Sequence, residues 1–205
     1  MYEYFTHSMV GMSKLVDILN SGGLDEAFTD QEAYEGGIPK GIYCHYIWDG
    51  LPIVYPDMQW VYKRIIFVMD TSIAKRNEMY ICDSVQYGHC VESPERRILH
   101  SNGNLKRKPN LNPLKKKILE DLHENVEQKK LKRGNKKINV YLMSHEVIFK
   151  GKIPLTFVKA ILIPKDEYKH PRIQRLEEYL TQRSIQLIPY APYTKNFHKY
   201  YEMIT

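Results

Sequence analysis

The chain has 205 residues, of which 43% are hydrophobic and 12% aromatic, and its formal net charge is +6 at pH 7. This length and apolar content are enough for one sizeable core, so we expect a single domain over residues 1–205. No apolar run approaches the roughly 20 residues that a membrane-spanning helix needs, and no signal peptide opens the chain. We therefore expect an intracellular, cytoplasmic protein that has no membrane partner.

The chain contains three cysteines, at positions 44, 82 and 90. An odd and sparse set of this kind favours a reducing compartment over a disulfide framework. The three residues also lack the paired C-x-x-C spacing of a structural zinc site. We expect no metal in this protein.

Strand and helix patterns alternate along the first half of the chain. A short strand precedes a helix in which Met12, Leu15, Val16 and Leu19 recur at helical spacing, and a run of small residues ending at Gly23 stops it. A Gly-bearing connection then leads to further strands, which are rich in β-branched and aromatic residues. These strands are expected over 41–48, 63–70 and 78–83. Residues 92–112 show no period and are expected to form a long loop.

The second half is expected to begin with a basic helix from Leu114 to Leu131, which has leucine and isoleucine on one stripe among charges. Strands and one more helix follow it along the chain. They are expected as a strand over 138–149, a turn over 150–152, a short helical turn and strand over 153–164, a helix over 171–183 and a strand over 185–189. The pattern predicts an α+β fold: a mixed β core with flanking helices and a basic helical insertion at about 105–137.

The excess of positive charge is concentrated between Lys106 and Lys137, in the segment KRKPNLNPLKKKILEDLHENVEQKKLKRGNKK. Such a run can pair with phosphates and release their counterions, which indicates nucleic-acid binding. Candidate nucleic-acid-binding residues are Lys115, Lys116 and Lys117. The alternative is a helix face that is simply exposed to solvent.

One carboxylate, Glu146, lies on a strand whose other residues are mostly apolar, in the segment SHEVIFKGKIPLTFVKAILIP. Because strand residues alternate between two faces, Glu146 shares a face with aliphatic neighbours. A buried carboxylate without a partner is costly or becomes protonated. Either a cleft opens at this strand, or the strand end is exposed and Glu146 pairs with Lys150 or Lys152.

The final third of the chain resembles the carboxyl-terminal part of the ADP-ribosyltransferase superfamily, and is most similar to the DNA-modifying DarT-type enzymes. The resemblance rests on a strand bearing Ser-His-Glu, a turn, Ile-Pro-Leu, another strand and a helix with Arg-Ile-x-x-Leu. It implies that Glu146 is the catalytic glutamate. It continues thinly over most of the chain, in the order of the segments YFTHSM, LVDILNSGGL, HYIWDGLPIVYPDM, KRIIFVMD and EMYICD.

The opening segments imply further site residues. The resemblance maps His7, Ser8 and Met9 onto dinucleotide-binding positions, and Tyr43 is a candidate for stacking on the nicotinamide ring. A surface histidine and a buried core tyrosine are the structural alternatives for His7 and Tyr43. The implied substrate is nicotinamide adenine dinucleotide (NAD), and the implied acceptor is a macromolecule, with DNA or RNA as candidates.

The chemistry implied by the resemblance explains an acid on an apolar strand. Cleavage of the bond between ribose and nicotinamide builds positive charge at the ribose, and a fixed carboxylate stabilises that charge by several kcal/mol. The same carboxylate can take a proton from the incoming nucleophile. A rigid strand is a suitable mount for it.

One feature of the DarT-type enzymes is missing. They use an arginine in the loop before the central strands, whereas residues 25–40 contain no arginine and Lys40 is the nearest cation. Lys40, Arg64 and Arg76 are candidates for that role. Two alternatives to transfer therefore stay open: a non-catalytic, basic nucleic-acid-binding protein on a degenerate transferase fold, and an NAD glycohydrolase. The acceptor and the oligomeric state are not indicated.

Overall fold

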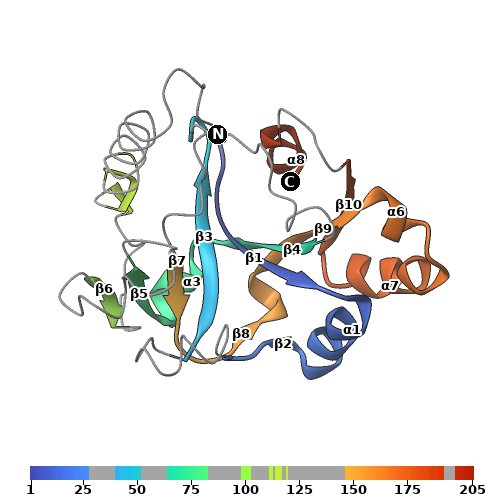
Figure 1. Cartoon of the computed structure of the whole chain (residues 1–205), viewed down its shortest axis with the longest axis horizontal. Helices are drawn as coiled ribbons and strands as arrows, with labels where there is room; N and C mark the ends of the chain where they lie inside the picture. The colour runs from blue at the N-terminus through green and yellow to red at the C-terminus, as the bar shows by residue number, and fades with distance from the viewer. Residues whose placement is uncertain are drawn as a thin grey trace, which may run out of the picture.

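The computed structural model describes residues 1–27, 40–51, 64–82, 98–102, 111–112, 114–116, 119, 146–191 and 197–205. Within them, eight strands form one sheet in the order β10-β9-β4-β1-β3-β7-β5-β6 (Figure 1). Their bounds are β1 (Glu3–Val10), β3 (Ile42–Trp48), β4 (Arg64–Asp70), β5 (Glu78–Cys82), β6 (Ile98–Asn102), β7 (Glu146–Phe149), β9 (Val158–Pro164) and β10 (Gln186–Tyr190). β9 and β10 are parallel, and the other pairs are antiparallel.

Short elements complete the described part. β2 (Gly23–Leu24) pairs with β8 (Ile153–Pro154). The helices are α1 (Met12–Ser21), α3 (Ile73–Arg76), α6 (Lys165–Tyr168), α7 (Pro171–Thr181) and α8 (His198–Glu202), with a 3₁₀ turn η3 (Leu155–Phe157). A mixed sheet flanked by helices confirms the expected α+β class. Figure 1 shows α1, α6 and α7 gathered beside the β9–β10 edge.

The central strands are buried on both faces because their sequences are apolar at both odd and even positions. In β4 the five residues from Ile65 to Met69 are each at most 5% exposed, and in β9 the four residues from Ala160 to Ile163 are fully buried. Side chains alternate between the faces of a strand, so continuous apolar runs indicate cover on both sides. A polar group on these strands therefore has little access to water unless the sheet opens.

The helix boundaries follow local capping chemistry. α1 ends where Gly22 adopts a left-handed conformation (φ 77°), and its N–H donates to the carbonyls of Ile18 and Leu19. Glycine takes this conformation without a Cβ penalty, which confirms the predicted stop. α7 begins with Pro171 at its first position, and Nδ1 of His170 accepts a hydrogen bond from the Arg172 N–H at 3.2 Å.

Some elements differ from the sequence-based expectation. The expected loop over 92–112 contains β6, an edge strand that pairs with β5. Its sequence ILHSN shows no strong period because an edge strand needs one backbone partner and no fully apolar face. The basic helix is already helical at Asn112, two residues before the predicted start. Residues 138–145 of the expected long strand and most of the 105–137 insertion lie outside the described residues.

β1 loses one of its two neighbouring strands partway along its length, and the candidate site lies where this happens. It pairs with β4 from Tyr4–Asp70 through Val10–Arg64, but its pairing with β3 runs from Glu3–Trp48 to Thr6–His45 and stops there. Figure 1 shows β1 bending away from β3 toward α1. We call the region between residues 7–10 of β1 and residues 42–44 of β3 the β1–β3 divergence.

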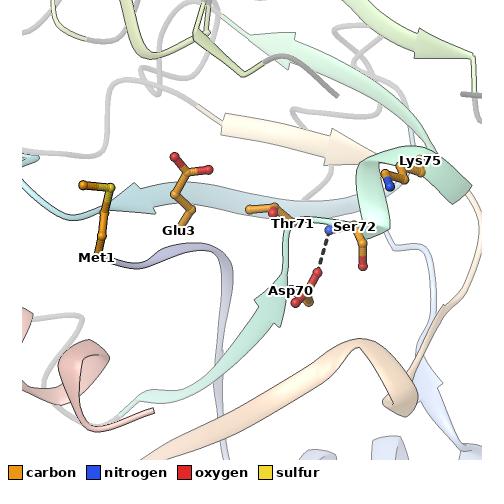
Figure 2. Close-up of a pocket in the computed structure, with 6 residues that line it drawn as sticks. All are labelled: Met1, Glu3, Asp70, Thr71, Ser72 and Lys75. Atoms are coloured by element: carbon orange, nitrogen blue, oxygen red, sulfur yellow. Dashed lines mark hydrogen bonds between the residues drawn. The ribbon is translucent and has the colours of Figure 1, made fainter. Parts of the chain in front are cut away.

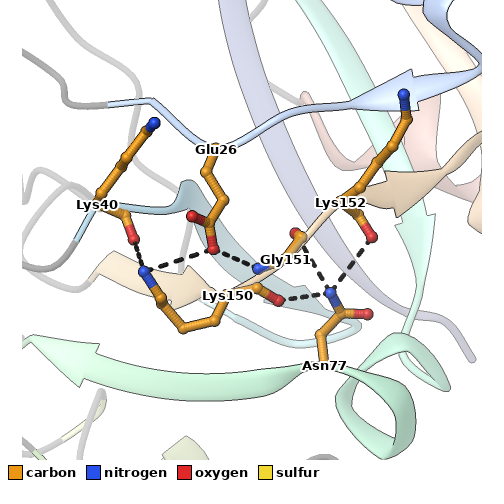
Figure 3. A network of polar contacts seen from close by, with 6 residues as sticks. All are labelled: Glu26, Lys40, Asn77, Lys150, Gly151 and Lys152. Carbon is orange, nitrogen blue, oxygen red and sulfur yellow. Dashed lines mark hydrogen bonds and ion pairs between the residues drawn. The ribbon is translucent and has the colours of Figure 1, made fainter.

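A polar network ties the β7–β8 turn to the start of β3 (Figure 3). The Lys150 ammonium donates to the Lys40 carbonyl and lies 3.4 Å from the Glu26 carboxylate, which also accepts a hydrogen bond from the Gly151 N–H. The buried Asn77 amide donates to the carbonyls of Lys150, Gly151 and Lys152 at 2.6, 3.3 and 3.4 Å. The turn that follows Glu146 is therefore held from two sides.

We predict that Asn77→Ala lowers the free energy of unfolding by about 2 kcal/mol, because three turn carbonyls lose a buried donor. Urea denaturation measures the change. Asn20→Ala, which alters an exposed residue of α1, is the control and should change stability by less than about 0.5 kcal/mol. Equal stability of the two variants would contradict a structural role for the Asn77 amide.

Candidate active site

The β1–β3 divergence brings together two candidate dinucleotide-binding residues, His7 and Tyr43. The imidazole Nδ1 of His7 lies 2.7 Å from the main-chain carbonyl oxygen of Tyr43. A carbonyl oxygen only accepts, so Nδ1 carries the proton and donates. Beyond the last β1–β3 pair at Thr6–His45, the His7 side chain thus supplies β3 with a hydrogen bond that the β1 backbone would otherwise donate.

The surroundings of His7 favour the neutral imidazole. Although the ring keeps some solvent contact, burial lowers its pKa below the usual value, and the positive charges of Lys14, His45 and Arg64 lower it further. The hydrogen bond to Tyr43 opposes this shift without reversing it. In the neutral ring with Nδ1 protonated, Nε2 is an acceptor. The single N–H of this neutral ring is already used by the Tyr43 carbonyl.

Arg64 stands at the first position of β4, beside the end of β1. Its Nη1 donates to the Ser8 hydroxyl at 3.2 Å, and its main-chain carbonyl accepts a hydrogen bond from the Tyr190 hydroxyl at 2.7 Å. The other two candidates for the missing arginine lie elsewhere. Arg76 packs its guanidinium 5.7 Å from the centre of the Phe157 ring, and Lys40 joins the network of Figure 3 through its carbonyl. Of the three cations, the structure brings Arg64 together with Ser8.

Three basic groups act on the same place. Lys14 of α1, His45 of β3 and Arg64 of β4 come from separate elements, and all three interact electrostatically with His7. Positive charge focused at one location attracts anionic ligands, and an arginine fork is well suited to phosphate oxygens. The divergence therefore combines a neutral acceptor, at His7 Nε2, with the positive charges of Lys14 and Arg64.

The remaining dinucleotide candidates differ in exposure. Met9 is 4% exposed and belongs to the apolar core, whereas Ser8 and Tyr43 are half-buried. Tyr43 pairs with Ile148 of β7, so β3 separates β1 from β7. Adjacent strands lie about 4.8 Å apart, which puts β1 and β7 roughly 10 Å from each other.

Glu146 is the first residue of β7 and pairs with Cys82 of β5. The backbone of Glu146 is described, but its side chain is not. By alternation, position 146 belongs to the same face of β7 as Ile148, the residue that faces Tyr43 across the ladder.

The lysines that were expected as exposed partners for Glu146 have other acceptors. Lys150 contacts Glu26 and the Lys40 carbonyl, and Lys152 contacts the Ser21 carbonyl at 2.6 Å and Asp25 at 3.4 Å. Both side chains therefore lie on the side of the turn that faces the β2 segment.

The first turn of the basic helix is anchored to the sheet. Leu114 is 1% exposed, and the Lys115 ammonium pairs with the Glu3 carboxylate and lies 5.9 Å from the centre of the Trp48 ring. Lys116 is exposed to solvent, and Lys117 lies outside the described residues. Lys115 therefore has a structural partner, and the nucleic-acid role of all three lysines stays a prediction.

Two pockets formed by described residues lie at the other end of β1. One has a volume of about 440 Å³ and is lined by acidic, basic and hydroxyl side chains (Figure 2), and the second, of about 320 Å³, is lined mainly by tyrosines and carboxylates. The first is bordered by Glu3, four residues and about 13 Å along the strand from His7.

The described residues contain no group of three or more metal-ligating side chains, and none of their helices is long and apolar enough to cross a membrane. The expectation that the protein uses no metal stays a prediction.

The site residues that sequence reasoning missed are Lys14 and His45, and it left Arg64 as one of three candidates. Their grouping depends on the antiparallel register, in which Val10 faces Arg64 and Thr6 faces His45. A signal was present in the sequence, because each of these cations lies within or directly beside an apolar element.

Comparisons with known proteins give distant likenesses. No family model and no curated protein matches the chain. Among solved structures, Thermosipho africanus DarTG in complex with ADP-ribose matches with a TM-score of 0.40 and 12% identity, over 92% of this chain and 50% of that one. Thermus sp. 2.9 DarT in complex with carba-NAD+ matches with a TM-score of 0.41 and 13% identity, over 91% of this chain and 94% of that one. The chain thus spans about half of the DarTG chain, and neither likeness is strong enough to define its activity.

We predict that the stability of the protein depends on the neutral state of His7. Because the pKa of His7 is lowered on folding, the unfolded chain binds more protons than the folded one just below pH 6.5. The free energy of unfolding should therefore decline as the pH falls through that region. In His7→Gln, whose amide can still donate to Tyr43, the decline should be smaller. Urea denaturation at pH 7.5, 6.5 and 5.5 compares the two slopes, and equal slopes would contradict the prediction.

Proposed function

We propose that the chain is an NAD-dependent ADP-ribosyltransferase that uses the β1–β3 divergence to bind the dinucleotide and Glu146 as its catalytic carboxylate. The observations that support this proposal most are two contacts where the strands part, from His7 Nδ1 to the Tyr43 carbonyl and from Arg64 Nη1 to the Ser8 hydroxyl. The sequence resemblance assigned His7, Ser8 and Met9 to the dinucleotide, and Tyr43 was a separate candidate for stacking on the nicotinamide.

The proposed binding mode follows from the charges and hydrogen-bonding groups at the divergence. His7 Nε2 accepts a hydrogen bond from a ribose hydroxyl, since Nδ1 is engaged with Tyr43. The positive field of Arg64, Lys14 and His45 attracts the pyrophosphate, and Arg64 takes the role of the arginine that residues 25–40 lack. The Tyr43 ring stacks on the nicotinamide.

The proposed reaction breaks the bond between the ribose anomeric carbon and the nicotinamide nitrogen. The bonding electrons leave with nicotinamide and neutralise its ring, while positive charge develops on the ribose. Glu146 stabilises that charge, and then takes the proton of the acceptor as the new bond to ADP-ribose forms. Because β7 is paired on both sides, by β3 and β5, the carboxylate is mounted on a rigid backbone.

The proposed acceptor is a nucleic acid. The chain has a pI of about 9.0, and an exposed lysine, Lys116, follows the anchored Lys115 at the start of the basic segment. Anchoring by Leu114 and Lys115 would fix where that segment leaves the sheet. The positive segment would then attract phosphates in a salt-dependent way.

The second candidate is a nucleic-acid-binding protein without catalysis, which the same basic segment favours. It predicts binding that weakens steeply with salt and no release of nicotinamide. An NAD glycohydrolase differs again, since it would release free ADP-ribose and leave any added DNA or RNA unlabelled.

We predict that the purified protein releases nicotinamide from NAD, and that Glu146→Gln lowers the rate by a factor of about 100 or more. The substitution keeps the shape of the side chain and removes the charge that stabilises the ribose cation. Chromatography of nicotinamide, with and without single-stranded DNA and RNA, measures the rate. NAD labelled in the adenosine half then shows whether ADP-ribose becomes attached to the nucleic acid.

The matched control is Glu178→Gln, which removes an exposed carboxylate of α7 and should leave release unchanged. Thermal unfolding of each protein shows that the variants are folded. If Glu146→Gln keeps the wild-type rate, the catalytic assignment is wrong. If the folded wild type releases no nicotinamide under any of these conditions, the transferase proposal is wrong.

We predict that Arg64→Met raises the KM for NAD about tenfold, because a charge-assisted contact of this kind contributes about 1.5 kcal/mol. Arg64→Lys should restore part of the loss, since it keeps the charge without the fork. Steady-state nicotinamide release measures KM. Arg175→Met, at an exposed position of α7, is the control, and an equal effect of the Met variants would contradict a role for Arg64 in binding.

A further inference from the structure

The smaller pocket lies where the start of the chain meets α8, far along β1 from the divergence. Its volume is about 320 Å³, and its lining includes three tyrosines, Tyr2, Tyr4 and Tyr201, and two carboxylates, Asp49 and Glu202. Among the residues that the structure describes, no lysine or arginine lines it. This volume is at the lower end for small-molecule sites, which suits a head group better than a dinucleotide.

The three tyrosines form a continuous aromatic wall. The rings of Tyr2 and Tyr4 are stacked, with centroids 5.7 Å apart and planes 12° from parallel, and the Tyr201 ring lies 5.8 Å from Tyr2 at an angle of 38°. Tyr2 and Tyr201 are 8% and 1% exposed. Tyr4 is half-buried and is the ring most open to the pocket, and the buried rings of Tyr2 and Tyr201 lie behind it.

Hydrogen bonds hold this wall in place. His198 Nε2 lies 2.6 Å from the Leu51 carbonyl oxygen, which only accepts, so Nε2 carries the proton and Nδ1 accepts from the Tyr2 hydroxyl. The Asp49 N–H donates to the Tyr2 carbonyl at 3.0 Å. The aromatic wall and one of the two acids are thus linked through the backbone before any ligand binds.

The pocket carries negative charge. Asp49 and Glu202 are exposed to solvent, and within the described part of the chain no lysine, arginine or histidine forms an ion pair with either carboxylate. Aromatic faces and free carboxylates both attract cations. A metal ion would gain from two carboxylates but would find apolar rings where it requires oxygen ligands.

We infer that this pocket binds an alkylated ammonium group. A plain ammonium is strongly hydrated and loses that hydration on entering an aromatic site. Methyl groups spread the charge and make contact with the rings, so a quaternary ammonium gains from both the tyrosines and the carboxylates. The group has two sources, a small free cation or a methylated lysine side chain of another protein.

Choline is the probe, and 3,3-dimethyl-1-butanol, in which carbon replaces the charged nitrogen, is its neutral counterpart. Saturation-transfer NMR with the full chain should show choline bound, with an affinity at least tenfold above that of the alcohol. Equal binding of the two compounds would overturn the inference. So would an absence of choline binding up to about 50 mM, a concentration about a hundred times a dissociation constant at the tight end of the millimolar range.

Variants assign the binding to this pocket. The double substitution Asp49→Asn and Glu202→Gln should weaken choline binding at least tenfold, and Tyr4→Leu should weaken it severalfold. The control, Asp166→Asn with Glu178→Gln, removes two exposed charges from α6 and α7 and should have no effect. An equal loss in the control pair would show that net charge, and not the pocket, attracts the cation.

A peptide bearing trimethyl-lysine distinguishes the two sources. If it binds at least tenfold more tightly than choline, with the same loss in the pocket variants, the ligand is a protein side chain. If the peptide and choline bind alike, the ligand is a small cation. Binding of the peptide that survives in the double variant would place its site elsewhere and overturn the inference.

Discussion

The structure depends on the point at which β1 stops pairing with β3 while it continues to pair with β4. Main-chain carbonyls inside a protein need a donor, and the ladder supplies none to β3 from β1 beyond Thr6–His45. The His7 imidazole supplies one to Tyr43. This single bond fixes the tautomer of His7 and joins the two strands beyond their last ladder pair.

The two ends of β1 have opposite electrostatic character. Toward its carboxyl end, cations from α1, β3 and β4 converge on His7. Toward its amino end, Glu3, Asp49 and Asp70 border two pockets, and Lys115 and Lys159 pair with Glu3 and Asp70. The separation of charge along one strand explains how a phosphate-bearing ligand and a cationic ligand can each have a place on the same small sheet.

Periodicity predicted the elements whose burial is decided locally, such as α1, with Leu15 and Leu19 on its buried face, and β4, which is apolar throughout. It could not predict β6 or α8, since one is an edge strand held by backbone pairing and the other is held by contacts with the far end of the chain. For the candidate site, the resemblance assigned His7, Ser8 and Met9 to the dinucleotide, and these assignments stay predictions. The choice of Arg64 over Lys40 and Arg76 needed the register of β1 against β4, because spacing in the sequence says nothing about which strands become neighbours.

The contact between Tyr2 and His198 joins residues 196 positions apart. A ribosome therefore completes nearly the whole chain before the aromatic ring at the start of β1 can meet its partner in α8. Contacts of such long separation form late and slow the folding of a domain. This end of the sheet is therefore the part of the fold that we expect to be completed last.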